Sequence, residues 1–395
     1  MLFGRLLFFC IFSAPFLHAS EVTVLVIPFH NESQSADLNW IGESVSETLM
    51  TELGAAGQIV LDRGSRKEGY RRLGLQPDTF YTKATLLKLG QTLDARLVCY
   101  GAYQITLPTP DAQPRDGSIR ISARFLDLRK LRDASEFSET GKLSDLSRLE
   151  EHLAWQTIHF LDPQSTITAE ELLQPSKLIR LDAKESFIRG LLATSDDQKQ
   201  KWFEQAAKLD PQYWQAAFEL GKLAFARKDY RQAETWFGRI PKTDPLYLDA
   251  SFQRGLSSYW AGDYRTAERC FRDLAKTVPL NEVFNNLGAA ESKLNANETA
   301  DDFRHALEGD RSDTTYNFNL ALTLYRQSKY DEAAQHLRTV LDHDAEDNEA
   351  IALLAKCRNH TPPAPATGHG MTERIKSNFD LVAFRQLKDV LQRVK

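Results

Sequence analysis

The side chains that could carry out chemistry are few and scattered along this chain. His152 and His159 lie seven residues apart, a spacing that could bring two metal ligands together only across two turns of one helix. No cysteine or carboxylate joins them in a metal-ligand arrangement, so we interpret both as surface or half-buried histidines. The adjacent Glu150 and Glu151 point in different directions, and we interpret them as part of a solvated helix face.

Sequence motifs for phosphate binding or nucleophilic catalysis are missing as well. The segment from Gly54 to Gly57 lacks the lysine and hydroxyl of a phosphate-binding loop. No serine stands in the glycine context of a nucleophile elbow. We therefore predict that the protein is not an enzyme and that it has no catalytic residue, no metal site and no cofactor.

A repeat of 33 or 34 residues is the strongest pattern, and it runs from about Phe187 to Asn359. Small residues recur at this period, namely Gly221, Gly255, Gly288, Ala321 and Ala355. An alanine follows twelve residues after each of the first four, and two repeats then add Phe237 or Phe271. A helix-turn-helix unit with a small residue where its two helices cross would require this pattern.

The segment from Glu219 to Pro245 resembles the tetratricopeptide repeat family. Its marker positions hold Leu220, Gly221, Tyr230, Ala233, Phe237 and Pro245. The resemblance implies an α-solenoid over residues 181–359, with about five repeats and a partial one near Asp347 to Asn359.

The first 19 residues have the features of an export signal. Arg5 precedes an apolar run from Leu6 to Leu17, and Ala19 is a small residue at a plausible cleavage point. This run is shorter than the roughly 20 residues that a membrane-spanning helix needs. We predict a signal peptide at 1–19, with a buried strand as the alternative. The protein is then exported, periplasmic or peripheral to the envelope, with no integral membrane segment after cleavage.

Charge and cysteine content exclude some classes of protein. The formal net charge is −5, and the loss of Arg5 makes it −6, which argues against a nucleic-acid partner. Beyond the signal, three cysteines remain, an odd number that implies no disulfide framework. We expect Cys99, Cys270 and Cys357 to be unpaired, and a bridge between the last two is the alternative.

Strand and helix patterns alternate between the signal and the repeats. Alternate valines from Val22 to Val26 open a strand, and apolar residues from Leu38 to Leu53 recur at helical spacing. Further strands are expected at 59–61, 96–105, 119–125 and 134–141, and further helices at 84–93 and 144–160. These patterns predict an α/β domain over residues 20–162, followed by a linker at 163–180.

This domain looks like the TolB amino-terminal type, which often precedes tetratricopeptide repeats in bacterial envelope proteins. The residues that carry the likeness are Pro28, Phe29, Asn31, Trp40, Ile41, Gly42, Glu43, Leu61, Asp62, Arg63, Ser65, Leu89, Gly90, Asp94, Ala95, Tyr100 and Gly101. The stretch 108–118 is longer than the family pattern. The resemblance implies a non-catalytic interaction module. The expected fold class is thus α+β/α: a small α/β domain, an α-solenoid and a C-terminal helix.

The end of the chain is expected to form a separate helix. Residues 361–371 are rich in proline and glycine and predict a flexible linker. From 372 to 395, apolar residues from Ile375 to Val394 recur at roughly helical spacing. This amphipathic helix could cap the last repeat, dock in the concave groove of its own solenoid, or bind the amino-terminal domain or a partner.

The tetratricopeptide resemblance also implies which first-helix positions face the concave groove. The candidate partner-binding residues are Phe218, Lys222, Phe225, Phe252, Tyr259, Asn285, Phe318 and Tyr325. Packing between repeats is an equal alternative for the aromatic residues. Tyr259 and Tyr325 are the better groove candidates, because a phenol tolerates a wet rim. For Asn285 the resemblance implies a polar contact, because in related repeats an asparagine near this position often holds a peptide backbone or a carboxylate.

These features predict a non-catalytic periplasmic scaffold or adaptor that binds protein or peptide partners through the groove of its repeats. The oligomeric state stays open. The alternative is a small-ligand-binding or enzyme-accessory envelope protein that uses the α/β domain. Its site would require polar groups that converge near His30, Asn31 and Arg63.

Overall fold

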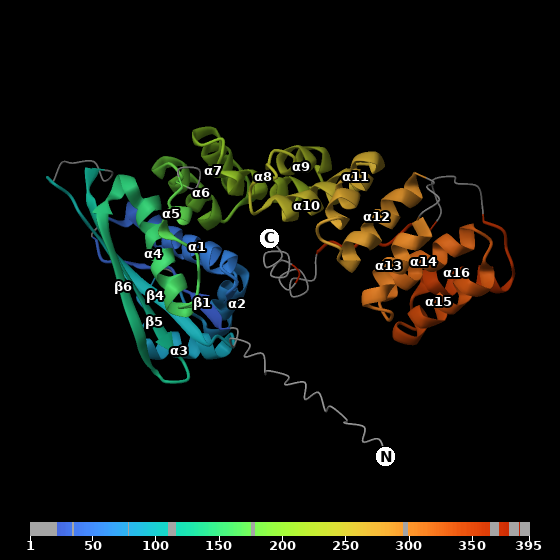
Figure 1. The fold of residues 1–395 in the computed structure, drawn as a ribbon, viewed down its shortest axis with the longest axis horizontal. Coiled ribbons are helices and arrows are strands. Elements are labelled where there is room, and N and C mark those ends of the chain that lie inside the picture. The colour runs from blue at the N-terminus through green and yellow to red at the C-terminus, as the bar shows by residue number, and fades with distance from the viewer. Residues whose placement is uncertain are drawn as a thin grey trace, which may run out of the picture. The chain divides into compact units, whose positions relative to one another are not determined.

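The computed structural model describes residues 22–33, 35–77, 79–109, 116–174, 178–294, 299–363, 371–378 and 387. The signal peptide expected at 1–19 lies outside them. The chain divides into two compact units between Leu178 and Ile179, within the connection expected at 163–180 (Figure 1). In the described part of the chain, no helix combines the length and the apolar character needed to cross a bilayer.

The amino-terminal unit is built on a mixed sheet. Its strands are β1 (Thr23–Val26), β2 (His30–Asn31), β3 (Ile59–Val60), β4 (Leu97–Thr106), β5 (Ser118–Asp127) and β6 (Arg132–Lys142). The order is β3-β1-β4-β5-β6, and β2 also pairs with β4. Strand β1 is parallel to β3 and β4, whereas β4, β5 and β6 form an antiparallel meander. The alternation predicted for β5 is confirmed, because Ile119, Ile121 and Phe125 are fully buried while Arg120 and Arg124 are exposed.

The helices of this unit are α1 (Trp40–Ala55), α2 (Arg63–Leu73), α3 (Lys83–Thr92), α4 (Leu146–Leu161) and α5 (Ala169–Leu172), with short 3-10 turns η1 (Ala36–Leu38) and η3 (Leu143–Asp145). Helix α2 was not predicted. Its start is marked by Asp62, whose side chain accepts a hydrogen bond from the Ser65 N–H at 2.7 Å. Its end is marked by Gly74, whose φ is 64°.

Helix α1 begins directly against the end of β1. The Phe29 N–H donates to the Gly42 carbonyl at 3.0 Å. A Cβ atom on Gly42 would lie 2.0 Å from the Phe29 carbonyl oxygen. Only glycine permits this approach of helix to strand, which explains the residue type at position 42.

The interpretation of Glu150 and Glu151 as a solvated face is wrong, because both are buried. Glu150 accepts hydrogen bonds from the hydroxyls of Ser44 at 2.6 Å and Thr48 at 2.9 Å. Ser44 and Thr48 are four residues apart on α1, so a single carboxylate of α4 reaches both. The Glu150 carboxylate therefore links α4 to α1 within the amino-terminal unit.

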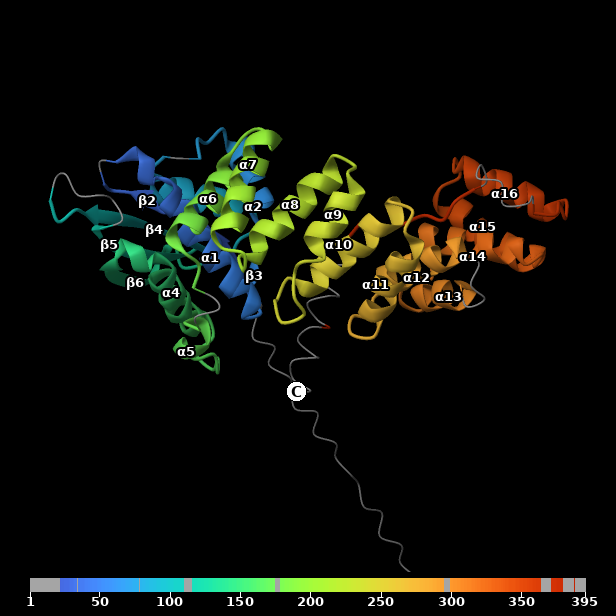
Figure 2. The same ribbon diagram turned by 90° about the horizontal axis from the view of Figure 1, so that it is seen from above.

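The second unit is a series of helix pairs, which follow one another in Figure 2. In the described residues the pairs are α6 (Leu181–Leu192) with α7 (Asp196–Leu209), α8 (Trp214–Ala226) with α9 (Tyr230–Phe237), α10 (Tyr247–Trp260) with α11 (Tyr264–Ala275), α12 (Asn281–Lys293) with α13 (Thr299–Gly309), and α14 (Thr314–Arg326) with α15 (Tyr330–His343). A single helix, α16 (Asn348–Arg358), follows. This arrangement confirms the predicted class of a small α/β region followed by a helical solenoid.

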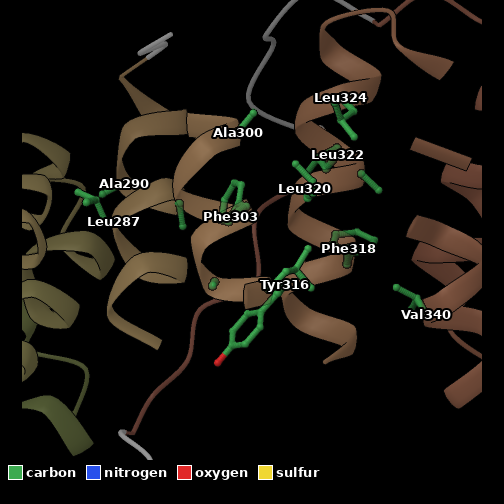
Figure 3. Packing of buried hydrophobic residues seen from close by; sticks show 14 of the residues in the cluster. Leu287, Ala290, Ala300, Phe303, Tyr316, Phe318, Leu320, Leu322, Leu324 and Val340 are labelled. Atoms are coloured by element: carbon green, nitrogen blue, oxygen red, sulfur yellow. The ribbon is translucent and has the colours of Figure 1, made fainter. Parts of the chain in front are cut away.

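The small residue of each repeat lies where the two helices of a pair meet. A Cβ on Gly221 would be 2.6 Å from the Phe237 ring, and a Cβ on Gly255 would be 2.8 Å from the Phe271 ring. Between the later repeats, buried side chains such as Leu287, Phe303, Phe318 and Val340 fill the space between helices (Figure 3). The period of 33 or 34 residues therefore arises from a contact that each helix pair repeats.

The C-terminal helix expected from residue 372 is wrong for its described first part. Residues 371–377 form no helix and run as an extended chain. The physical reason is that the backbone N–H groups of Arg374 and Lys376 donate hydrogen bonds to the side chains of Asn319 on α14 and Asn286 on α12. A helix would use these groups internally. The rest of the expected helix, at 379–386 and 388–395, lies outside the described residues.

Candidate functional site

The extended residues 371–376, here called the tail segment, lie against α12, α14 and the start of α16. The side chains that hold them form the docking face, which consists of Asn285, Asn286, Ser292, Lys293, Asp313, Tyr316, Phe318, Asn319, Arg326, Asp347 and Glu349. These residues come from α12, α14, α16 and the caps that precede α14 and α16. The docking face is our candidate functional site.

Two asparagines of the docking face bind the backbone of the tail segment. Asn319 accepts from the Arg374 N–H at 2.7 Å and donates to the Arg374 carbonyl at 2.7 Å. Asn286 accepts from the Lys376 N–H at 2.9 Å and donates to its carbonyl at 2.8 Å. In an extended chain these groups on alternate residues point to one edge. The two amides therefore replace a neighbouring strand.

Asn285, which the sequence analysis singled out for polar contact, lies beside these two residues. Its side-chain N–H donates to the Arg374 carbonyl at 3.0 Å, and its oxygen accepts from Asn319 at 2.8 Å. All three asparagines, including Asn286, are fully buried. Their mutual hydrogen bonds fix the amide orientations before the tail segment adds its own.

The carboxylate of Glu373 enters a cationic pocket. It accepts a hydrogen bond from the Ser292 hydroxyl and pairs with Arg326 and with Lys293, the last at 2.8 Å. Arg326 also donates to the Met371 carbonyl at 3.0 Å. Burial alone would raise the pKa of Glu373, but the two cations and the hydroxyl outweigh it, and the pKa is lowered. The buried group is therefore a carboxylate.

The side chain of Arg374 lies between an aromatic ring and two acids. Its guanidinium carbon is 3.6 Å from the centre of the Phe318 ring. Two of its nitrogens pair with the two oxygens of Asp347, at 2.7 and 2.8 Å, and one also contacts Glu349 at 3.1 Å. The Arg374 hydrogen bonds lower the pKa of Asp347 despite its partial burial.

The side chain of Lys376 has a smaller site. Its ammonium pairs with Asp313 at 2.6 Å and lies 4.9 Å from the centre of the Tyr316 ring. The intervening Ile375 is partly buried against the hydrophobic core of the helical unit. In Figure 3 the Tyr316 ring turns away from the other labelled side chains.

Three predicted partner-binding residues belong to an earlier repeat and are engaged there. Phe218 packs edge-on against Phe237, with ring centres 5.4 Å apart. Lys222 is exposed and pairs with Glu219 at 2.9 Å. Phe225 is partly buried. The structure does not bring these residues together with Asn285.

The other predicted aromatic residues lie in the core of the helical unit. Phe252 is fully buried against Phe271, with ring centres 5.7 Å apart. Tyr259 and Tyr325, the better groove candidates, are only 5% and 7% exposed. Burial, followed by the charge of Glu373, raises the pKa of Tyr259. Among the predicted aromatics, Phe318 is the one placed both in the core and under a tail side chain.

Asn286, Lys293, Asn319 and Arg326 are among the residues that bind the tail segment and were not expected from the sequence. Both asparagines precede the small residue of their repeat by two positions, and both cations follow it by five. Polar residues that recur at the same two repeat positions are the sequence signal that could have indicated these binding residues. These two repeat positions differ from the three first-helix positions that the family resemblance assigns to the groove.

The alternative ligand site in the amino-terminal unit is not assembled by its proposed residues. The His30 ring packs edge-on against Phe80, with ring centres 5.3 Å apart. The Asn31 amide donates to the Ser35 carbonyl at 2.9 Å, within its own turn. Arg63 pairs with Glu43 at 2.9 Å. Each of the three side chains thus has a separate local contact.

A buried charge cluster does lie near Arg63. Arg66 is 2% exposed, pairs with Glu43 at 2.5 Å and donates to the Val26 carbonyl at 3.1 Å and the Ser46 hydroxyl at 2.6 Å. These bonds tie α2 to α1 and to the end of β1. The three hydrogen bonds of the buried Arg66 guanidinium, to Glu43, Ser46 and the Val26 carbonyl, indicate a structural role.

Stability of the amino-terminal unit is expected to fall as the pH rises from about 4.5 to about 7. Burial, followed by the Glu43 charge, raises the pKa of Glu47 from 4.5 to about 7, although Arg63 and Arg66 oppose this. Between these values the folded unit holds a proton that the unfolded chain has released, so stability is full below pH 4.5 and decreases with rising pH. Hydrogen exchange of α1 peptides across this range measures it. Glu47→Gln should remove this part of the slope, and an unchanged slope would contradict the assignment.

Among the described residues, no group of three histidines, cysteines or acids could hold a metal ion. His152 is partly buried and pairs with Glu139 at 2.6 Å. The three cysteines outside the signal are unpaired, which confirms that prediction.

A surface depression of about 570 Å³ lies between α11 and α12 and is lined by Arg265, Glu268, Arg269, Arg272, Asp273, Glu291 and Leu294. Three arginines face three acids there. Arg272 pairs with Glu268 at 2.8 Å and with Glu291 at 2.5 Å. The balanced charges favour a salt-bridge network over an anion site.

Comparison with known proteins identifies the helical repeats. The tetratricopeptide repeat family model matches residues 201–247 and 318–362. Among solved structures, MamA 41-end from Desulfovibrio magneticus RS-1 shares 19% identity, with a TM-score of 0.39, over 42% of this chain and 97% of its own. YrrB, titled a TPR protein with an unusual peptide-binding site, shares 16% identity, with a TM-score of 0.39, over 45% and 92%.

A third structure, the LpoB C-terminal domain from Salmonella enterica, shares 13% identity, with a TM-score of 0.25, over 31% of this chain and 83% of its own. Comparison with curated proteins gives no significant match. The family model thus identifies tetratricopeptide repeats at the matched residues.

Proposed function

We propose that this protein is a non-catalytic scaffold of the bacterial periplasm that binds an extended segment of a partner protein at the docking face. One observation carries the proposal: the docking face already holds an extended peptide, with both peptide groups of Arg374 and of Lys376 bonded to asparagine amides. Backbone pairing of this kind supplies affinity, and side-chain pockets supply specificity.

Export and the amino-terminal unit complete the proposal. The signal pattern at 1–19 and the TolB-like residues support a place in the cell envelope. The amino-terminal unit then docks to another envelope component, which makes the protein an adaptor. The small-ligand alternative has less support, because His30, Asn31 and Arg63 are engaged in separate local contacts.

A peptide with the sequence of residues 371–378 tests the proposal. Its receptor is the full chain with Glu373→Ala, Arg374→Ala and Lys376→Ala, here called the tail-release variant, in which the tail side chains no longer compete. We expect saturable binding by fluorescence anisotropy. Adding Asn319→Ala removes two backbone hydrogen bonds and should weaken binding by about 1–3 kcal/mol, roughly fivefold to 150-fold.

The matched control for this experiment is Arg338→Ala, a change at an exposed residue of α15. It should leave the affinity unchanged. Circular dichroism of each variant checks that the helices are intact. Absence of binding to a folded tail-release variant, or equal binding with and without Asn319, would overturn the proposal.

A further inference from the structure

We propose that partner segments of the docking face carry an acidic residue, a basic residue directly after it, and a second basic residue two positions later, and that they bind by displacing the tail segment. This inference rests on the proposed function and specifies the chemistry of the partner. The three charged positions correspond to Glu373, Arg374 and Lys376.

The acidic position is the most selective of the three. The Glu373 side chain is fully buried, and its carboxylate meets the charged groups of Lys293 and Arg326 together with the Ser292 hydroxyl. A neutral residue here would leave two cations without their counter-charge. A basic residue would place a third positive charge among them.

The first basic position favours arginine over lysine. Asp347 presents both carboxylate oxygens to two nitrogens of Arg374, and the Phe318 ring lies 3.6 Å from the guanidinium carbon. A planar guanidinium satisfies both contacts at once, whereas an ammonium is a point charge.

The second basic position accepts a compact cation. One oxygen of Asp313 receives the Lys376 ammonium at 2.6 Å. The other oxygen caps α14 by accepting from the N–H groups of Thr315 and Tyr316 at 2.8 and 3.1 Å. The cap fixes the aspartate, so the position of this negative charge is set before any segment binds.

The asparagine amides fix the register of these charges. Asn319 and Asn286 bind the backbone of two alternate residues, so a bound segment cannot slide by one position without losing these pairs. A slip by one residue would also place Arg374 at the pocket of Lys293. Order and spacing of the charges are therefore both specified.

The tail segment is itself a competitor for this site. It is part of the same chain, about a dozen residues beyond α16. A segment so connected acts at an effective concentration on the order of millimolar. An external segment must therefore match the charge pattern well enough to displace it.

Anisotropy measurements with labelled peptides test the inference on the full chain. The probes are the 371–378 peptide and three versions of it, with Glu373→Lys, Arg374→Glu or Lys376→Glu. Each charge reversal should weaken binding to the tail-release variant by at least about tenfold. A peptide changed only at the exposed Ser377, as Ser377→Ala, is the control and should bind like the original.

Two receptor comparisons complete the test. The wild-type chain should bind the original peptide at least about tenfold more weakly than the tail-release variant, because its tail competes. Adding Arg326→Glu to the tail-release variant should partly restore binding of the Glu373→Lys peptide. The Arg326 side chain is 37% exposed, so we expect this variant to fold, and circular dichroism checks that it does.

The outcomes separate this inference from the proposed function. If the original peptide binds neither receptor, the proposed function fails and the inference with it. If all peptides bind the tail-release variant equally, peptide binding stands but the charge pattern is overturned. If wild type and tail-release variant bind the original peptide equally, displacement of the tail is overturned.

Discussion

Replacing Arg66 with methionine is expected to lower the free energy of unfolding of the amino-terminal unit by about 3–5 kcal/mol. The reason is that Glu43 would stay buried after losing its closest cationic partner. Glu43 is 4% exposed, and without Arg66 its buried charge would keep only Arg63, at 2.9 Å. The Val26 carbonyl and the Ser46 hydroxyl would also lose a donor.

Urea unfolding, with hydrogen exchange to assign the loss to α1 and α2, measures this effect. The matched control is Arg72→Met on the same helix, where an exposed arginine pairs with the partly exposed Glu68. That change should give no measurable loss. The double change Arg66→Met with Glu43→Leu should cost less than Arg66→Met alone, because it leaves no unpaired Glu43 charge. A loss at Arg66 no larger than at Arg72 would rule out the structural role.

Replacing Gly255 with valine is expected to destabilise the helical unit by about 1–3 kcal/mol. A Cβ at this position would lie 2.8 Å from the Phe271 ring. Phe271 is fully buried, so its ring cannot turn into solvent to make room. The pair α10 and α11 must then separate, and the neighbouring repeats lose part of their packing.

Thermal unfolding of Gly255→Val checks this expectation. Gly54→Val is the control, because a Cβ on that helical glycine meets nothing within 4 Å. Combining Gly255→Val with Phe271→Leu should cost less than the sum of the two changes, since the shorter side chain relieves the overlap. Strict additivity would show that the ring contact is not the cause.

The repeats could be predicted from sequence because each one contains the same close contact between its two helices. Gly221 and Gly255 each accommodate a phenylalanine ring from the next helix, and this pairing leaves a visible period. Strand β5 was predictable for a similar reason, because its alternation of buried and exposed residues is local. Helix α2 was missed because it buries only Arg66, Gly69 and Tyr70 and has no apolar stripe.

The tail segment and Glu150 could not be read from local patterns. Ile375 and the apolar residues after it do follow a helical spacing. The groups that hold Arg374 and Lys376 extended lie 55 and 90 residues away in sequence. Likewise, the partners of Glu150 on α1 are 106 and 102 residues away. Contacts at such separations decide conformation only after the chain has folded around them.

The charges of the docking face are placed at the ends of helices. Lys293 and Arg326 lie in the last turns of α12 and α14, while Asp313 and Asp347 cap the starts of α14 and α16. Helix dipoles favour this arrangement with or without a ligand. An approaching segment therefore meets the positive side chains of Lys293 and Arg326 in one place and the negative side chains of Asp313 and Asp347 in another. The electric field of these charges orients the segment before contact. Its association rate should depend on ionic strength, whereas its dissociation rate should be set by the buried contacts.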